Sequence, residues 1–90
     1  MSIHSFSDDQ LVRLYVTGRE EALETLLHRH KGKIFASIRV IIKDHSLAED
    51  IFQDTFFKVI QTLKRGQYNE EGKFLPWVIR ISRNLIIDHF

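Results

Sequence analysis

Four residues near the middle of the chain have a spacing that indicates a binding surface: Asp50, Gln53, Asp54 and Phe57. They fall at i, i+3, i+4 and i+7, so on a helix they share one face. Polar groups beside an aromatic ring suit a protein–protein contact, because they fix the register while the ring supplies buried area. For Phe57 the sequence also allows packing against the first helix, and both possibilities stay open. The apolar residues of the same stretch fall on the other side of the helix: Ile51, Phe52, Phe56, Val59, Ile60 and Leu63.

Candidate catalytic groups are present, but their spacing does not favour an enzyme. Asp50 and Asp54 could form a carboxylate pair, yet the face they share is expected to be exposed and to lack a pocket. Neither Ser37 nor Ser82 has a base at a spacing that would activate its hydroxyl group. No phosphate-cradling glycine loop occurs. We therefore expect no catalytic residues.

The metal-binding side chains of the sequence are also not arranged as a site. His28 and His30 are two positions apart, so on a helix they do not face each other. The other histidines are scattered, and there is no cysteine. We expect surface histidines, no metal and no cofactor. The absence of cysteine excludes a disulfide scaffold and fits a reducing cytoplasm.

The N-terminal half predicts two helices in a chain whose 90 residues make one small domain or a piece of a larger protein. Ser7 and Gln10 form a capping box that starts the first helix, and Gly18 is expected to end it. The second helix is expected from residue 19 or 20 to about residue 43. Gly32 lies inside it and should weaken or bend it slightly.

The C-terminal half predicts two more helices, so the expected fold is an all-α, compact four-helix domain. Ser46 and Glu49 form a second capping box, which would start a helix running to about residue 65. A polar loop over residues 66–73 follows, and the last helix begins around residue 74 with Pro76 in its first turn. Its expected inner face comprises Phe74, Trp77, Val78, Ile81 and Leu85.

Charge is distributed in blocks, although the net charge is only +1. This small net charge gives no strong field for nucleic acid over the whole domain. A basic block is followed by an acidic one, and two such blocks indicate either two contact surfaces or ordinary solvated helix faces. The N-terminus has no apolar core of a signal peptide, and no apolar run could span a bilayer, so a cytoplasmic location is expected. The blocks are Arg29, Lys31, Lys33, Arg39 and Lys43, then Asp44, Glu49, Asp50 and Asp54.

Two stretches read together resemble region 2 of bacterial sigma factors of the sigma-70 family, in particular the extracytoplasmic-function (ECF) branch. They are LAEDIFQDTFFKVI, residues 47–60, and FLPWVIRISRNLIIDHF, residues 74–90. The upstream stretch GREEALETLLHRHKGKIF, residues 18–35, is also similar to the family, so the resemblance covers nearly the whole chain. The matching residues, in the family's order, are Ala48, Glu49, Asp50, Gln53, Asp54, Phe56, Phe74, Trp77, Ile81, Asn84 and Asp88.

The resemblance implies a transcription initiation domain that binds RNA polymerase core. In this family the acidic helix docks on the clamp helices of the largest polymerase subunit. Members of the branch continue into a helix-turn-helix domain, so residues 1–90 are expected to be the N-terminal part of a longer protein. An anti-sigma factor is a further partner that the resemblance allows. Carried over to this sequence, the polymerase-binding positions are Asp50, Gln53 and Asp54, with Phe57 and Lys58 beside them.

The resemblance also implies recognition of the promoter −10 element on the non-template strand, with one base flipped into a pocket. An asparagine can make two hydrogen bonds to a base edge, and arginines can contact phosphates. The loop acids Glu70 and Glu71 would repel phosphate. The alternative function is a sigma-like protein-interaction domain without DNA recognition. The expected DNA-binding residues are Tyr68, Lys73, Arg80, Arg83, Asn84 and Ile87.

The sequence also leads to expectations for three aromatic residues and for one face of the last helix. Tyr68 is expected either to stack on a base or to be a surface turn residue. Phe74 and Trp77 are expected in the core rather than on DNA. On the last helix, the outer face with Arg80, Arg83, Asn84 and Ile87 is expected to lie opposite Trp77 and Ile81.

Overall fold

The computed structural model describes residues 3–68 and 73–90, so the loop acids Glu70 and Glu71 lie outside the described residues. A short 3-10 helix, η1 (Ile3–Ser5), precedes four α-helices: α1 (Asp8–Val16), α2 (Glu20–Ile41), α3 (His45–Lys64) and α4 (Phe74–His89). The described residues form no strand, and the predicted all-α, four-helix fold is confirmed. None of these helices is both long enough and apolar enough to cross a membrane.

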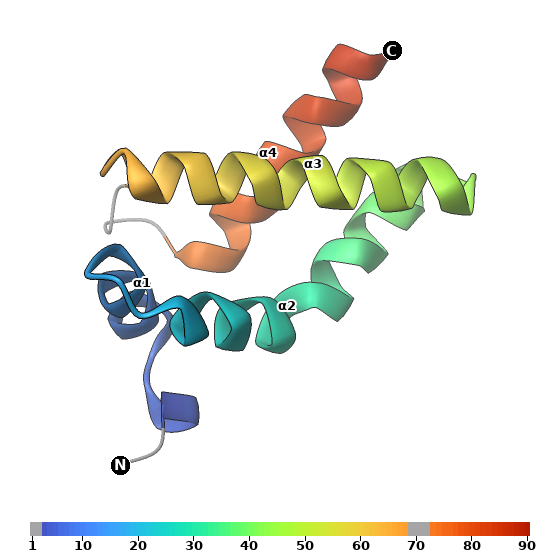
Figure 1. The fold of residues 1–90 in the computed structure, drawn as a ribbon. Coiled ribbons are helices and arrows are strands. Elements are labelled where there is room, and N and C mark those ends of the chain that lie inside the picture. Colours follow the sequence, from blue (N-terminus) through green and yellow to red (C-terminus); the bar gives the residue numbers. More distant parts are fainter. Residues whose placement is uncertain (1–2, 69–72) are drawn as a thin grey trace.

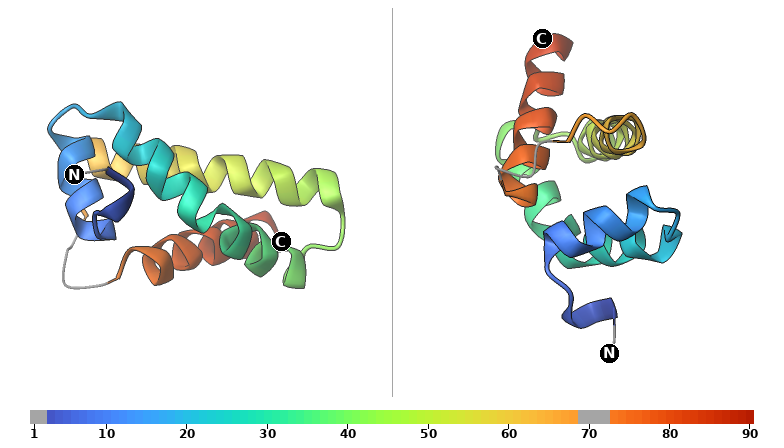
Figure 2. Two further views of the ribbon diagram at one scale, coloured as in Figure 1. Left: turned by 90° about the horizontal axis from the view of Figure 1, so that it is seen from below. Right: turned by 90° about the vertical axis from the view of Figure 1, so that its left-hand side faces the viewer.

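The two long helices, α2 and α3, run antiparallel and form the frame of the domain (Figure 1). Helix α1 packs against α2 and also contacts α3. Helix α4 crosses α3 steeply and contacts both long helices (Figure 2). The short helix η1 and the C-terminal end of α4 lie on opposite sides of α3 (Figure 1), and the longest dimension of the molecule is 41 Å.

Of the two capping boxes predicted at helix starts, one is present in the structure and the other is not. At α1 the predicted capping box is present: the Gln10 amide donates to Ser7 Oγ at 3.2 Å, and the Ser7 amide donates to Gln10 Oε1 at 2.8 Å. At α3 the predicted box is wrong. Asp44 is the N-cap there, and its Oδ1 accepts from the Leu47 amide at 3.1 Å. Ser46 therefore lies inside the first turn of α3.

Asp and Ser are about equally good N-caps, so residue type alone could not decide between Asp44 and Ser46. The extended backbone of Asp44, with φ −75° and ψ 120°, decides it. The predicted glycine at the end of α1 is confirmed, and a second glycine follows α3. Gly18 and Gly66 follow α1 and α3 with positive φ angles of 112° and 68°, a region that favours glycine. Gly32 lies inside α2, and the ribbon of that helix changes direction part-way along its length (Figure 1).

The hydrophobic core draws on all four α-helices, and most of the predicted stripes are confirmed. At the C-terminal end of α2, Ile41 is 47% exposed, whereas Ile38 is fully buried. On α4 the buried stripe is rotated relative to the prediction: Leu85 is only half-buried, whereas Ile86 is 4% exposed and Ser82 is fully buried. The Ser82 hydroxyl donates to the Ile79 carbonyl at 2.7 Å, so the polar group is satisfied inside the helix. Apolar residues with no exposed surface come from every helix: Leu11, Ala22, Leu26, Ile34, Ile38, Ala48, Val59, Leu63 and Val78.

Candidate functional site

The solvent-facing side of α3 carries the predicted set of polar residues. Asp50, Gln53 and Asp54 are all exposed, as their helical spacing predicted. Within the described part of the chain, their side chains take part in no hydrogen bond or ion pair. By contrast, Glu49, one position earlier, pairs with Nε2 of His45 at 2.8 Å. The three polar side chains are therefore available to a partner.

Phe57 lies on this same face and is 63% exposed. Packing against the first helix, one of the two possibilities left open by the sequence, is therefore excluded. The aromatic contacts of α3 are made instead by Phe52 and Phe56, whose ring centroids are 5.0 Å apart. An exposed phenylalanine among unpaired polar side chains is typical of a contact surface, because interface cores are enriched in aromatic residues. We call Asp50, Gln53, Asp54 and Phe57 the α3 face.

Lys58, next to the α3 face, lines a depression of about 240 Å³ between α3 and α4. The α4 side of this depression includes Ile81, Asn84 and Asp88. Asn84 thus lies beside Ile81 and not opposite it, so this part of the prediction is wrong. The reason is geometric: Asn84 follows Trp77 by seven residues, which is nearly two full helical turns.

The outer side of α4 carries the other members of the expected DNA-binding set. Arg80, Arg83 and Ile87 are all exposed, and Ile87 is 70% exposed. Their spacing of three and four residues places them on one face. Two guanidinium groups on one exposed helix face can reach phosphate oxygens.

Tyr68 lies four residues beyond Lys64, the last residue of α3, and packs edge-on against Trp77, with ring centroids 4.6 Å apart. Both rings also contact Phe74, Tyr68 at 6.4 Å and Trp77 at 5.9 Å. Tyr68 is half-buried against the core and is not a simple surface turn residue. Phe74 is a core residue with 1% exposure, as predicted, whereas Trp77 is only partly buried. We call Tyr68, Phe74 and Trp77 the aromatic cluster.

Lys73, the N-cap residue of α4, is exposed but lies in acidic surroundings. It shares a depression of about 210 Å³ with Ser7, Asp8, Asp9 and Phe74. Nearby carboxylates reduce the attraction of a lysine for phosphate. Of the expected DNA-binding side chains, Lys73 therefore has the least favourable surroundings for that role.

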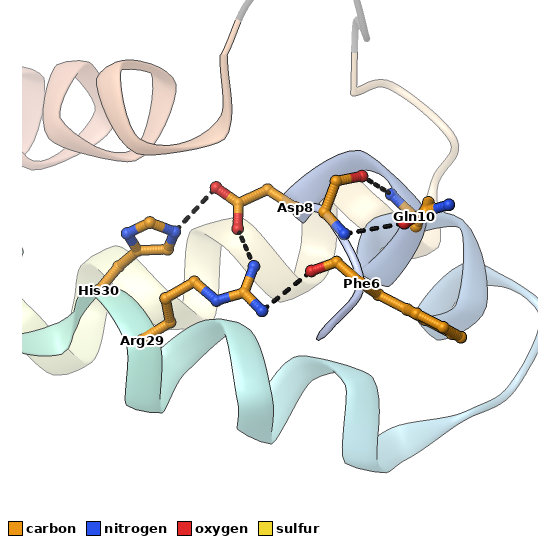
Figure 3. A network of polar contacts seen from close by, with 6 residues as sticks. Phe6, Asp8, Gln10, Arg29 and His30 are labelled. Atoms are coloured by element: carbon orange, nitrogen blue, oxygen red, sulfur yellow. Dashed lines mark hydrogen bonds and ion pairs between the residues drawn. The ribbon is translucent and has the colours of Figure 1, made fainter. Parts of the chain in front are cut away.

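A polar network joins the start of α1 to the middle of α2 (Figure 3). Asp8 Oδ1 accepts from Arg29 Nη1 at 2.8 Å, and Asp8 Oδ2 accepts from His30 Nε2 at 2.8 Å. Arg29 also donates through Nη2 to the Phe6 carbonyl at 2.9 Å. Sequence reasoning missed this network, because Asp8 is separated from its two partners by 21 and 22 positions and no local spacing connects them.

The network corrects two expectations. His28, His45 and His89 are exposed as predicted, but the side chain of His30 is only 13% exposed. The basic block is also not a uniform free surface, because Arg29 is committed to the network. At the other end of the block, Arg39 donates to the Lys43 carbonyl at 2.9 Å and so helps to close the C-terminus of α2.

No group of acidic or histidine side chains among the described residues could hold a metal ion.

Comparison with known families identifies this arrangement. The family described as Sigma-70 region 2 matches residues 26–90. The chain belongs to the sigma-70 region 2 family. Its matched part includes the α3 face, the aromatic cluster and all of α4. The family resemblance expected from the sequence is thereby confirmed.

Curated relatives agree with this assignment. The chain is 34% identical over 71 residues to the RNA polymerase sigma factor CarQ of Myxococcus xanthus, covering 79% of this chain and 40% of that protein. It is 29% identical over 82 residues to the RNA polymerase sigma-H factor of Pseudomonas aeruginosa, covering 91% of this chain and 42% of that protein. It is 27% identical over 82 residues to the ECF RNA polymerase sigma factor BldN of Streptomyces coelicolor, covering 90% and 30% of the two chains.

These names support the ECF type of sigma-70 region 2. The chain spans only 30–42% of the length of these three relatives. No solved structure matches the chain.

Proposed function

We propose that this chain is the region 2 domain of an ECF sigma factor, that it binds RNA polymerase core through the α3 face, and that it recognises the promoter −10 element through α4. The observation that carries the proposal is the α3 face itself. Phe57 is 63% exposed there, among three unpaired polar side chains. An aromatic ring among hydrogen-bonding side chains matches the composition of binding interfaces, where such rings contribute most of the binding energy.

The polymerase partner is the pair of clamp helices of the largest subunit. Asp50 and Asp54 supply negative charge, Gln53 supplies hydrogen-bonding groups, and Lys58 lies at the border of the face. Charged and amide groups fix the register of such a contact, while the ring of Phe57 adds the apolar area whose burial drives binding.

The DNA partner is the non-template strand of the −10 element. Arg80 and Arg83 are suited to phosphate contacts, and Asn84 to hydrogen bonds with a base edge. Ile87 adds exposed apolar surface on the same side of α4. Tyr68 and Lys73 flank the start of that helix, where a flipped base would be held. In this proposal Lys73 contributes least, because Asp9 lies in the same depression.

The second candidate is a protein-interaction domain that binds polymerase without reading DNA. Two observations favour it: the net charge is only +1, and Asp8 and Asp9 line the same depression as Lys73. Both candidates share the α3 face, so only DNA binding separates them.

An ECF sigma factor would continue beyond residue 90 into a second DNA-binding domain, would act in the cytoplasm, and could be held by an anti-sigma factor.

The polymerase contact is tested by the double variant Asp50→Ala, Gln53→Ala in a pull-down with polymerase core. Both side chains are exposed, so we expect loss of core binding with a nearly unchanged melting temperature. The matched control is Glu20→Ala with Glu24→Ala, two exposed residues four positions apart on α2. Full retention of core binding by the α3 variant would contradict the assignment.

The DNA contact is tested by titrating the polymerase–chain complex with single-stranded oligonucleotides that vary the −10 sequence. The first candidate predicts a preference for particular bases. Binding that requires polymerase but shows no base preference would favour the protein-interaction candidate instead.

A further inference from the structure

The network around Asp8 fixes the first turn of α1 against α2. Both carboxylate oxygens of Asp8 are occupied, one by Arg29 and one by His30, each at 2.8 Å. A carboxylate only accepts hydrogen bonds, so the proton of this contact lies on Nε2 of His30. The side chains are largely shielded from water, with exposures of 27% for Asp8 and 13% for His30. The hydrogen bond therefore sets the orientation of the His30 ring.

The His30 ring continues the connection toward α4. Its centroid lies 5.7 Å from that of Phe74, with an angle of 39° between the ring planes. Phe74 is the first residue of α4 and in turn contacts Tyr68 and Trp77. An unbroken series of contacts therefore runs from Asp8, through His30 and Phe74, to the aromatic cluster.

The start of α4 depends strongly on this packing. Its N-cap residue, Lys73, makes no side-chain capping hydrogen bond to the free backbone N–H groups of the first turn. Hydrogen bonds from a cap side chain, which fix the start of α1, are thus missing here. The buried ring of Phe74 replaces them as the anchor, and His30 forms one wall of its surroundings.

We infer that Asp8 and His30 are positioning residues for promoter reading: they hold Phe74, and through it the Tyr68–Trp77 pair and the direction in which α4 presents Arg80 and Asn84. This inference rests on the proposed function of α4. Neither residue needs to touch DNA for this role. Its consequence is that helix α1, which lies outside residues 26–90 matched by the family, contributes to DNA recognition through α2 and α4.

Trp77 allows a direct test, because it is the single tryptophan of the sequence and belongs to the aromatic cluster. The first variant is Asp8→Asn, which leaves one acceptor oxygen for the two donors Arg29 and His30. The second variant is His30→Gln, which removes the aromatic ring that contacts Phe74. The control is Asp9→Asn, which removes the same charge from the same first turn of α1. Comparison with this control separates positioning from the general effect of removing a negative charge near DNA.

Two readouts are measured well below the melting temperature of each variant. The first is the emission maximum of Trp77 and its quenching by acrylamide in the free chain. The second is binding of a −10 oligonucleotide by the complex with polymerase core. We expect Asp8→Asn and His30→Gln to shift the emission and to weaken oligonucleotide binding about fivefold, which corresponds to about 1 kcal/mol. Core binding should stay unchanged, and Asp9→Asn should neither shift the emission nor weaken oligonucleotide binding.

The inference is overturned if both variants match Asp9→Asn in emission and in oligonucleotide binding. If Asp8→Asn does not fold, His30→Gln against the same control decides the matter. A shifted Trp77 emission with unchanged oligonucleotide binding would also contradict the positioning role. Absence of base preference in the complex with the unmodified chain is a different result, because it contradicts the proposed function whatever the variants do to Trp77.

Discussion

Lys58 of α3 and Asn84 of α4 line the same depression, although the family resemblance assigns the first to polymerase and the second to promoter DNA. The two proposed contact surfaces therefore meet at this point of the domain. The adjacency also means that the two roles must be separated by experiment, residue by residue.

Asn84→Ala should relax the base preference of the polymerase complex while leaving core binding intact. A hydrogen-bonded pair between an amide and a base edge contributes about 1–3 kcal/mol of discrimination. The check is a competition titration with oligonucleotides that differ at one position of the −10 element. Lys58→Ala is the matched variant across the depression, and it should weaken core binding instead. Equal effects of both variants in both assays would contradict the division of roles.

Arg80→Ala with Arg83→Ala should weaken oligonucleotide binding equally for all sequences and reduce its salt dependence. Each lost phosphate contact lowers the slope of log K against log salt concentration by about 0.7 for a single strand. Binding of the complex is measured over a range of salt concentrations. The control is Lys31→Ala with Lys33→Ala, two exposed charges on α2. An unchanged slope in the arginine variant would exclude phosphate contacts by this face.

Asp44→Ala should lower the free energy of unfolding by about 1 kcal/mol, because it removes the N-cap of α3. Ser46→Ala should change it by less than about 0.5 kcal/mol, because Ser46 is exposed and does not cap the helix. Thermal or urea unfolding of the two variants provides the comparison. If Ser46→Ala lowered the free energy of unfolding more than Asp44→Ala did, Ser46 would be the N-cap, as the sequence predicted.

Phe74→Ala should destabilise the domain by about 3–5 kcal/mol, since its ring is 1% exposed and anchors the start of α4. A loss of this size is a large part of the stability of a small domain. Urea unfolding monitored by circular dichroism measures it. A change below about 1 kcal/mol would mean that the ring is not packed as described.

The fold followed from local signals in the sequence, whereas the contacts between distant segments did not. Apolar spacing predicted the helices, and the capping box of Ser7 predicted the start of α1. Helical periodicity also predicted that Asp50, Gln53 and Asp54 share an exposed face. Periodicity describes one helix at a time, however, so it left the exposure of Phe57 open.

Helical periodicity could not predict the contacts between different helices. The pairing of Asp8 with Arg29 and His30 joins α1 to α2, and the contact of His30 with Phe74 joins α2 to α4. Their existence depends on how α1, α2 and α4 pack. Asn84 is a different case, because the helical repeat alone places it near Trp77 and Ile81 rather than opposite them.

The central claim is that the α3 face binds polymerase core, and Phe57→Ala tests it most directly. Because Phe57 is 63% exposed, the variant should change the free energy of unfolding by less than about 0.5 kcal/mol. It should weaken core binding by about 2 kcal/mol or more, as expected for an aromatic side chain at the centre of an interface. The control is Val40→Ala on α2, which removes an apolar side chain that is 72% exposed and should affect neither quantity.

The decisive measurement is the affinity of the Phe57→Ala variant for polymerase core, determined beside its thermal melt. A loss of affinity of about thirtyfold with an unchanged melting temperature is the predicted result. An affinity equal to that of the Val40→Ala control would contradict the account.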